Sequence, residues 1–352
     1  MEDSQQEFLY DLLETPSPSG YETQAQRRWI DYVETFADEV RTDGYGNAVG
    51  VLNGEGPAIA IGGHTDEIGY IVRKIDDEGY IHLGRIGGSD KTVSRGQHVK
   101  IHNGDDSIHG VIGQTAIHLR DKDDETYDSI AEQQVDIGAA DEEEAKELVE
   151  VGDPVTIATT VNELQSTRIA ARGLDNRVGT WVAAETLRRA AERDVDATVY
   201  AVSTVQEEVG LKGAQMIGEE LAPDAAVAVD VTHATDYPSA PGDKASDVAL
   251  GEGPVVGRGS ANHPKVVDTV RTAADETEID IQLSAAGIRT GTDADAFFTQ
   301  AGGIPSLNLG IPNRYMHTPV EVIDTEDLDA AVEVLVEAVA STDSDTSFSV
   351  DL

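Results

Sequence analysis

The chain has 352 residues, 39% of them hydrophobic, which is enough to bury a core in about two domains. Its 67 acidic and 25 basic residues give a formal net charge of -42, which excludes nucleic-acid binding because that function needs a basic face. The sequence contains no cysteine, which excludes disulfides, thiolate zinc sites and a thiol nucleophile.

The N-terminal region predicts two helices followed by two strands. Apolar residues recur at helical spacing over 4–14 and over 23–40, with the breaker stretch ETPSPSGYE between them. Residues 47–52 and 58–62 are strand-like runs, and the second is wholly apolar, as in strands buried in a central sheet. This second run leads into Gly62-Gly63-His64-Thr65-Asp66.

The pattern of apolar residues and turns changes between about residues 70 and 165. Short alternating runs are separated there by Gly and Asp turns, which predicts a small all-β barrel or sandwich. One acidic helical patch at 141–149 interrupts these runs. The region is therefore expected to be an all-β insertion in the chain.

After residue 172 helices and strands alternate again. We expect helices at 176–193, near 212–220, and at 264–276, 293–301 and 325–341. We expect strands at 197–203, 225–230, 279–285 and 305–309. The fold class is thus α/β, interrupted by the all-β insertion, and the polar tail STDSDTSFSVDL is expected to fray.

The acidity also suggests a habitat. Only eight of the basic residues are lysines, aromatic residues make up 5%, and the acidic residues are spread along the whole chain. This pattern is typical of proteins from salt-saturated cytoplasm, where charges are screened over about 3 Å at 1 M salt. The sequence has neither the N-terminal pattern of a signal peptide nor an apolar run of roughly 18 residues. We therefore expect a soluble, cytoplasmic protein with no membrane partner.

Five short segments hold candidate functional residues, and most follow a predicted strand, where open α/β sheets place their sites. In the first segment, His64 could present an imidazole at the sheet edge. Asp66 could then hold the other ring nitrogen, as carboxylates commonly do for metal-binding histidines. Taken alone, a structural histidine is an equally good interpretation.

The second and third segments supply acidic residues. Asp175 directly precedes a predicted helix, so taken alone it is better interpreted as an N-cap. Glu207 and Glu208 follow an apolar strand, where adjacent acids repel each other unless a cation or a proton resolves the conflict. One glutamate as metal ligand and the other as general base would do so, and a solvated loop is the alternative.

The last two segments complete a ligand set. Asp230 is expected to end an apolar strand, which is costly for a carboxylate unless it is paired, metal-bound or solvated. His317 lies in a loop framed by Pro and Gly, where a solvated histidine is the alternative. Together, two His, two Asp and one Glu suit Zn²⁺ or Co²⁺, and Mn²⁺ less well. A bridging carboxylate would place two such ions about 3.5–4 Å apart.

The motifs GGHTDEIGYIV, ARGLDNRVG, STVQEEVGLKGA, AVDVTHA, GTDADAF and IPNRYMHTPVEVI carry a family resemblance along nearly the whole chain. The sequence resembles the tetrahedral (TET) aminopeptidases, relatives of the glutamyl and deblocking aminopeptidases that have also been called cellulases. This resemblance implies an α/β/α sandwich catalytic domain, residues 1–68 and 166–352, with a mixed, mostly parallel central sheet. It also implies an inserted barrel-like domain, residues 69–165, that takes part in oligomerisation.

The resemblance further implies specific roles. Two divalent metal ions per subunit, Zn²⁺ or Co²⁺, would be held by His64, Asp175, Glu208, Asp230 and His317. Asp175 would bridge the ions, Glu207 would be the general base, and Asp66 would orient His64. Apart from the resemblance, we expect the specificity pocket in the region from Gly287 to Phe298, with Arg289, because these residues precede and enter a predicted helix. N-capping of that helix by Thr292 or Asp293 is an equally good interpretation.

The implied function is a cytoplasmic aminopeptidase that uses metal-activated water on peptide substrates and assembles as a dodecamer built from dimers. The nearest alternative is another two-metal hydrolase, such as a deacetylase or a carboxypeptidase. A glycoside hydrolase needs two carboxylates about 5–9.5 Å apart and leaves His64 and His317 unexplained. A non-catalytic binding protein has no use for Glu207.

Overall fold

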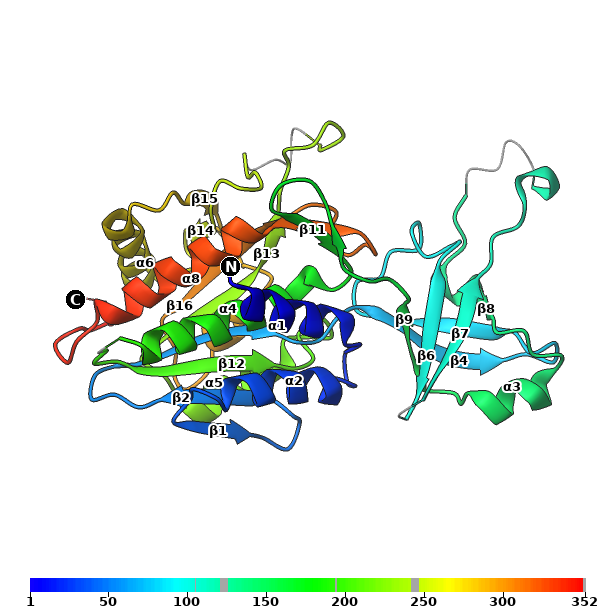
Figure 1. The fold of residues 1–352 in the computed structure, drawn as a ribbon, viewed down its shortest axis with the longest axis horizontal. Coiled ribbons are helices and arrows are strands. Elements are labelled where there is room, and N and C mark those ends of the chain that lie inside the picture. Colours follow the sequence, from blue (N-terminus) through cyan, green and yellow to red (C-terminus); the bar gives the residue numbers. More distant parts are fainter. Residues whose placement is uncertain (105, 121–125, 194, 242–246, 351–352) are drawn as a thin grey trace.

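The computed structural model describes residues 1–352 except 105, 121–125, 194, 242–246 and 351–352. These residues form an α/β body and a β-barrel that projects from one end of it (Figure 1). Within the described part of the chain, no helix has the length and apolarity needed to cross a membrane.

A central sheet forms the middle layer of the α/β body. Its strands are β1 (Glu39–Thr42), β2 (Ala48–Leu52), β3 (Ala58–His64), β12 (Thr198–Thr204), β13 (Ala225–His233), β14 (Val255–Arg258), β15 (Gln282–Ala285) and β16 (Ser306–Asn313). They lie in the order β1-β2-β12-β3-β13-β16-β14-β15, and the middle strands β12, β3, β13 and β16 are parallel. Strands β2 and β14 run antiparallel to their inner neighbours, so the predicted mixed, mostly parallel sheet is confirmed.

Helices cover both faces of this sheet, which confirms the α/β/α sandwich. On one face lie α1 (Asp3–Glu14), α2 (Thr23–Val33), α4 (Leu174–Ala191), α6 (Pro264–Thr277) and α8 (Thr325–Ala340). On the other lie α5 (Lys212–Leu221) and α7 (Asp293–Phe297). Because α4 is enclosed by the sheet and by α1, α2 and α8, it is buried over most of its length, with Trp181 fully buried at its centre.

The inserted region forms a closed barrel, one of the two folds expected from its short runs of alternating apolar and polar residues. Its strands are β4 (Gly69–Ile75), β5 (Ile81–Ile86), β6 (His98–Asn103), β7 (Asp106–Ile112), β8 (Gln134–Asp136) and β9 (Pro154–Ile157). It has its own apolar core, and α3 (Glu142–Leu148) packs against this core through Ala145. The short helices η1 (Ile117–Leu119) and η2 (Ile130–Glu132) lie between β7 and β8. The exact domain limits at 68/69 and 165/166, and the role of the barrel in oligomerisation, stay predictions.

A small antiparallel sheet that the sequence did not predict lies where the chain re-enters the body. It consists of β10 (Asn162–Glu163), β11 (Arg168–Ala171) and β17 (Glu321–Asp324). Strands β11 and β17 pair from Arg168 opposite Asp324 to Ala171 opposite Glu321. This register places Glu321 beside the start of α4, where the candidate site begins.

The helix predicted over 23–40 is wrong in its second half. It ends at Val33, and Val40 lies instead in edge strand β1, opposite Gly50. Helical spacing misled the prediction because Phe36 and Val40 pack against the main core from a turn and a strand. A strand can present the same apolar residues to a core as a helix does.

Strand β14 was also not predicted from the sequence, and the remaining differences lie at the ends of elements. The helix predicted over 293–301 is shorter, and the strand predicted over 279–285 begins at Gln282. The fraying expected of the C-terminal tail is wrong at Phe348, which is only 5% exposed and belongs to the main core. Burial of an aromatic side chain offsets the entropy lost by ordering such a tail. The last residues of that tail, 351–352, lie outside the described part.

Two glycines allow α4 to lie directly on the sheet beneath the candidate site. A Cβ at Gly63 of β3 would lie 2.6 Å from the carbonyl carbon of Gly179, and one at Gly179 would lie 2.3 Å from the Val229 carbonyl oxygen. Gly63→Ala is therefore expected to destabilise the fold by about 1–3 kcal/mol, as overpacked substitutions do. Urea unfolding measures this loss against Gly113→Ala, where the added methyl meets no atom within 4 Å. Equal stability of the two variants would contradict this packing.

Candidate metal centre

The middle strands of the sheet bring most of the candidate residues to one edge. His64 is the last residue of β3, Glu207 and Glu208 follow β12, and His317 follows β16. Asp230 lies on β13, between β3 and β16. Because β12, β3, β13 and β16 are parallel neighbours, their carboxyl ends meet at this edge, which is where open α/β sheets place their sites.

The expectation that Asp230 ends its strand is wrong. Strand β13 continues to His233 because it pairs with β16 in parallel up to His233 opposite Asn313. Its pairing with β3, however, ends at Ala228 opposite Gly62. Asp230 therefore lies beyond the point where β3 leaves the ladder, and its Oδ1 lies 3.8 Å from His64 Nε2.

The start of α4 explains why Asp175 does not act as an N-cap. Asp175 and Asn176 have non-helical backbone angles, and the peptide bond between them is cis. The side-chain oxygen of Asn176 accepts a hydrogen bond from the Gly179 N–H at 3.0 Å, which is the bond that an N-cap residue makes. The carboxylate of Asp175 thus stays available, and its backbone N–H donates to Glu321 at 3.0 Å.

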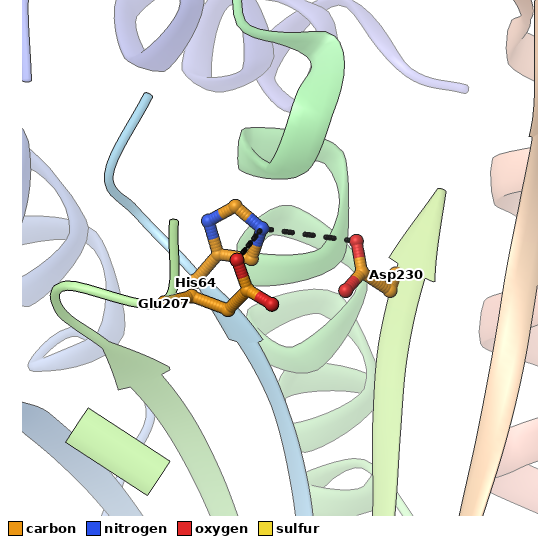
Figure 2. A group of neighbouring side chains, drawn as sticks. All are labelled: His64, Glu207 and Asp230. Carbon is orange, nitrogen blue, oxygen red and sulfur yellow. Dashed lines mark ion pairs between the residues drawn. The ribbon is translucent and has the colours of Figure 1, made fainter. Parts of the chain in front are cut away.

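A first cluster of possible metal ligands surrounds the buried imidazole of His64 (Figure 2). His64 Nε2 lies 3.7 Å from Glu207 Oε2 and 3.8 Å from Asp230 Oδ1. It also lies 3.2 Å from Asp175 Oδ1. In Figure 2, the dashed lines from Glu207 and Asp230 meet at this nitrogen. Glu207 therefore lies within reach of the same ion as His64 and Asp230.

A second cluster surrounds His317. Its Nε2 lies 3.2 Å from Asp175 Oδ2 and 3.6 Å from Glu208 Oε1. In each cluster the possible ligand atoms lie within 4.8 Å of one another. Asp175 directs one carboxylate oxygen to His64 and the other to His317, which is the arrangement of a bridging carboxylate.

The electrostatics of the cluster favour bound cations. Burial raises the pKa of Glu207 to about 9 against the opposing charge of His64, and burial likewise raises the pKa of Asp230 to about 8. Burial also opposes ionisation of Asp175, but hydrogen bonds from His317 and His64 outweigh it and lower its pKa. The centre opens to a cavity of about 320 Å³ whose lining, among the described residues, includes neither Lys nor Arg. Carboxylates held this closely need positive charge, and His with carboxylate oxygens is the ligand set that Zn²⁺ or Co²⁺ takes.

Asp66 makes more contacts than the sequence suggested. His64 Nδ1 lies 3.0 Å from the Asp66 backbone oxygen and 3.4 Å from its carboxylate. The same carboxylate accepts hydrogen bonds from the backbone N–H groups of Glu207 and Glu208 at 2.9 and 3.2 Å, and from the Ser19 hydroxyl at 2.7 Å. Asp66 thereby fixes the loop that carries both glutamates.

Sequence reasoning missed two acids that support the site. Glu321 accepts hydrogen bonds from the backbone N–H groups of Asp175 and His317, at 3.0 and 2.9 Å. Glu22 accepts one from Gln206 N–H at 3.2 Å, directly before the glutamate pair. An acid between apolar residues, as in Pro-Val-Glu-Val-Ile, is the signal that could have indicated Glu321.

The region predicted to form a specificity pocket borders the centre. Arg289 and Thr290 line a neighbouring cavity of about 820 Å³, and Thr290 also lines the cavity of the metal centre. Thr292 caps α7 by accepting a hydrogen bond from the Ala294 N–H. Asp293 is buried and accepts one from the Thr204 hydroxyl at 2.6 Å. The role of the region from Gly287 to Phe298 in specificity stays a prediction.

Comparison with known proteins agrees with this geometry. The model of the M42 glutamyl aminopeptidase family matches residues 46–334, which include every candidate residue of the centre. The chain belongs to the M42 family. It is therefore a hydrolase of peptide bonds of the aminopeptidase type, in a family that is generally metal-dependent.

Several relatives of this M42 enzyme are similar over nearly their whole length. The lysyl aminopeptidase of Pyrococcus furiosus is 33% identical over 93% of this chain and 94% of its own. A TET aminopeptidase from a marine sediment Thaumarchaeota archaeon has 32% identity and a TM-score of 0.91, covering 97% of this chain and 98% of its own. The TET1 peptidase of Pyrococcus horikoshii has 31% identity and a TM-score of 0.86, covering 96% and 99%.

Proposed function

We propose that this M42 enzyme removes N-terminal residues from peptides at a two-metal centre, with Glu207 as general base. The observation that carries the proposal is Asp175, whose two oxygens face two separate groups of ligands. His64 and Asp230 would complete one metal site, and Glu208 and His317 the other. Two ions, Zn²⁺ or Co²⁺, would supply positive charge that acidifies water and polarises a carbonyl.

The residues of the chain would move the proton. Glu207 takes a proton from the attacking water and returns it to the leaving amine. Burial favours the neutral form of the Glu207 carboxyl and raises its pKa, whereas the positive charge of two bound ions would oppose this, so Glu207 would be ionised before the attack and could hold the proton after it. Asp66 holds Glu207 in place through its backbone N–H and keeps His64 aligned. Carboxylates around the cavity attract the free α-amine of the peptide, which would restrict cleavage to its N-terminal residue.

Several finer points are part of the same proposal. The family argues for peptide substrates over those of a deacetylase, a glycoside hydrolase or a non-catalytic protein. The P. horikoshii relative can assemble into a tetrahedron or a large octahedral shell, and the similar structure PhTET1-12s is a dodecamer, which supports a homo-oligomer. We propose, more specifically, a dodecamer built from dimers. A cytoplasmic location and a halophilic source remain proposals from the composition alone.

Metal removal tests the proposal. Chelation with EDTA is expected to lower turnover of aminoacyl-anilides by about a thousandfold or more, because the ions supply several kcal/mol of transition-state stabilisation. Adding back Zn²⁺ or Co²⁺ in concentrated KCl should restore activity, and titration should give two ions per chain. N-acetylated anilides serve as the control and should stay uncleaved. Full activity after complete metal removal, or cleavage of the acetylated compounds, would overturn the proposal.

A further inference from the structure

A second cavity, of about 690 Å³, lies between the barrel and the metal centre. Met316 and His317 line both this cavity and that of the centre, so the two adjoin at a proposed metal ligand. Strands β4 and β5 and the loop that follows β5 supply its barrel side. Three cationic residues of this side line the cavity: Arg73, Arg85 and Lys91.

These three charged side chains line the cavity without a directly bonded carboxylate in the part of the chain that the structure describes. Among the residues that the structure describes, none of the three forms an ion pair with a carboxylate. The side chains of Arg73 and Lys91 donate only to backbone oxygens, each at 3.2 Å, and the Arg85 side chain makes no hydrogen bond within the same residues. Asp90 also lines the cavity, but its carboxylate accepts hydrogen bonds from Thr92. The cavity keeps an excess of positive charge in a chain whose net charge is -42.

A β-bulge places Arg73 on the cavity. Val72 pairs with Leu83 and Lys74 with His82, so Arg73 is the extra residue of β4 between them. A bulge of this kind interrupts the alternation of a strand and redirects the side chain that it carries. Arg73 and Lys74 are consequently both exposed in succession, and Arg73 lines the cavity while Lys74 does not. The distortion of the strand thus adds one cation to this wall.

We propose that the pocket lined by Arg73, Arg85 and Lys91 binds a carboxylate of the peptide substrate while the N-terminal peptide bond lies at the metal centre. This inference rests on the proposed function. The carboxylate can come from the C-terminus of a short peptide or from an acidic side chain, since both offer the same anion. Arginine forks bind carboxylates through paired N–H groups, and Lys91 adds a point charge.

Matched substrate pairs test the pocket and identify the source of the carboxylate. Alanyl-alanine and its amide differ only at the C-terminus. Glutamyl- and glutaminyl-p-nitroanilide differ only in the first side chain, and alanyl-glutamate and alanyl-glutamine amides differ only in the second. In the metal-loaded enzyme, the triple variant R73Q/R85Q/K91Q should lower kcat/KM for the carboxylate member of one pair on the order of tenfold. That estimate combines losses of about twofold for each of the three exposed cations.

The neutral members of the pairs and the variant Lys74→Gln are the controls. Lys74→Gln removes the same charge from the neighbouring position of β4, so it reports any effect of net charge alone. Arg85→Gln, which breaks no hydrogen bond to a described residue, keeps the test valid if the triple variant is unstable. Unchanged preferences in all three pairs, or equal losses in Lys74→Gln, would overturn the inference. A wild-type enzyme that cleaves none of these compounds would instead count against the proposed function.

Discussion

Glu207→Gln is expected to lower kcat by about 100- to 10,000-fold, the range that a positioned general base contributes. The amide cannot accept the proton of the attacking water, whereas the Glu207 carboxylate can, and burial of that group raises its proton affinity. The five proposed ligands, in contrast, remain. Both ions should therefore stay bound, and the KM for an aminoacyl-anilide should change little. Steady-state kinetics and metal analysis of the same preparation measure the two properties together.

Glu220→Gln is the matched control for this experiment, because Glu220 is an exposed glutamate on α5. It should keep both full turnover and full metal content. The position of Glu207 Oε2 near His64 Nε2 makes the alternative outcome informative. If Glu207→Gln loses an ion along with its activity, Glu207 is a ligand rather than the base. If it keeps its ions and near-normal activity, the proton passes through another group.

Glu67→Gln is expected to destabilise the fold by about 3–5 kcal/mol, the cost of breaking a buried ion pair from one side. The Glu67 carboxylate pairs with both Arg172 and Arg177, and all three residues are buried. An amide would leave these two guanidinium groups without a charged partner where water does not reach them. Urea unfolding at constant KCl measures the difference from the wild type at neutral pH.

The pH dependence of this loss gives a second check. Burial opposes ionisation of Glu67, but the charges of Arg172 and Arg177 outweigh it and lower its pKa to about 2. A carboxylate with a lowered folded-state pKa stabilises the fold above its unfolded pKa of about 4.3 and loses this effect as the pH falls toward 2. The stability gap between wild type and Glu67→Gln should thus be full above about pH 5 and shrink toward pH 2.

The exposed pair of Glu39 and Arg41 provides the control for Glu67. Glu39→Gln should cost less than about 1 kcal/mol because both partners are solvated. A loss in Glu67→Gln no larger than this, or one independent of pH, would contradict a buried ion cluster.

Local patterns predicted much of the body and the barrel. The helix expected over 4–14 occurs as Asp3–Glu14, and the closing helix expected over 325–341 as Thr325–Ala340. Both have apolar residues at helical spacing, and an aspartate caps the second. The convergence of the candidate residues also followed from strand order, since strands buried in a parallel sheet end at one edge. Their roles as ligands and base remain predictions.

Features that depend on distant parts of the chain escaped prediction. Strand β17 exists through its pairing with β11, and Glu321 meets the start of α4 only because of that pairing. The Asn176 cap could not be distinguished from an Asp175 cap, because both residues favour that position. Similarly, no local pattern predicts that Glu67 lies between two arginines that follow it by more than a hundred residues.

The order of strands has a consequence for how the chain folds during synthesis. The barrel closes by pairing strands within residues 69–157, so its contacts are available early. In the central sheet, β3 pairs with β12 up to His64 opposite Thr204. Strand β16 can pair fully with β13 only after residue 313 has been synthesised. Closing a long loop costs conformational entropy before the contacts between its ends can form, so pairing of strands distant in sequence slows folding. The barrel should therefore fold on the ribosome before β12 and β13, the neighbours of β3 in the sheet, have been synthesised. Until then β3 is an unpaired apolar strand that needs protection from aggregation.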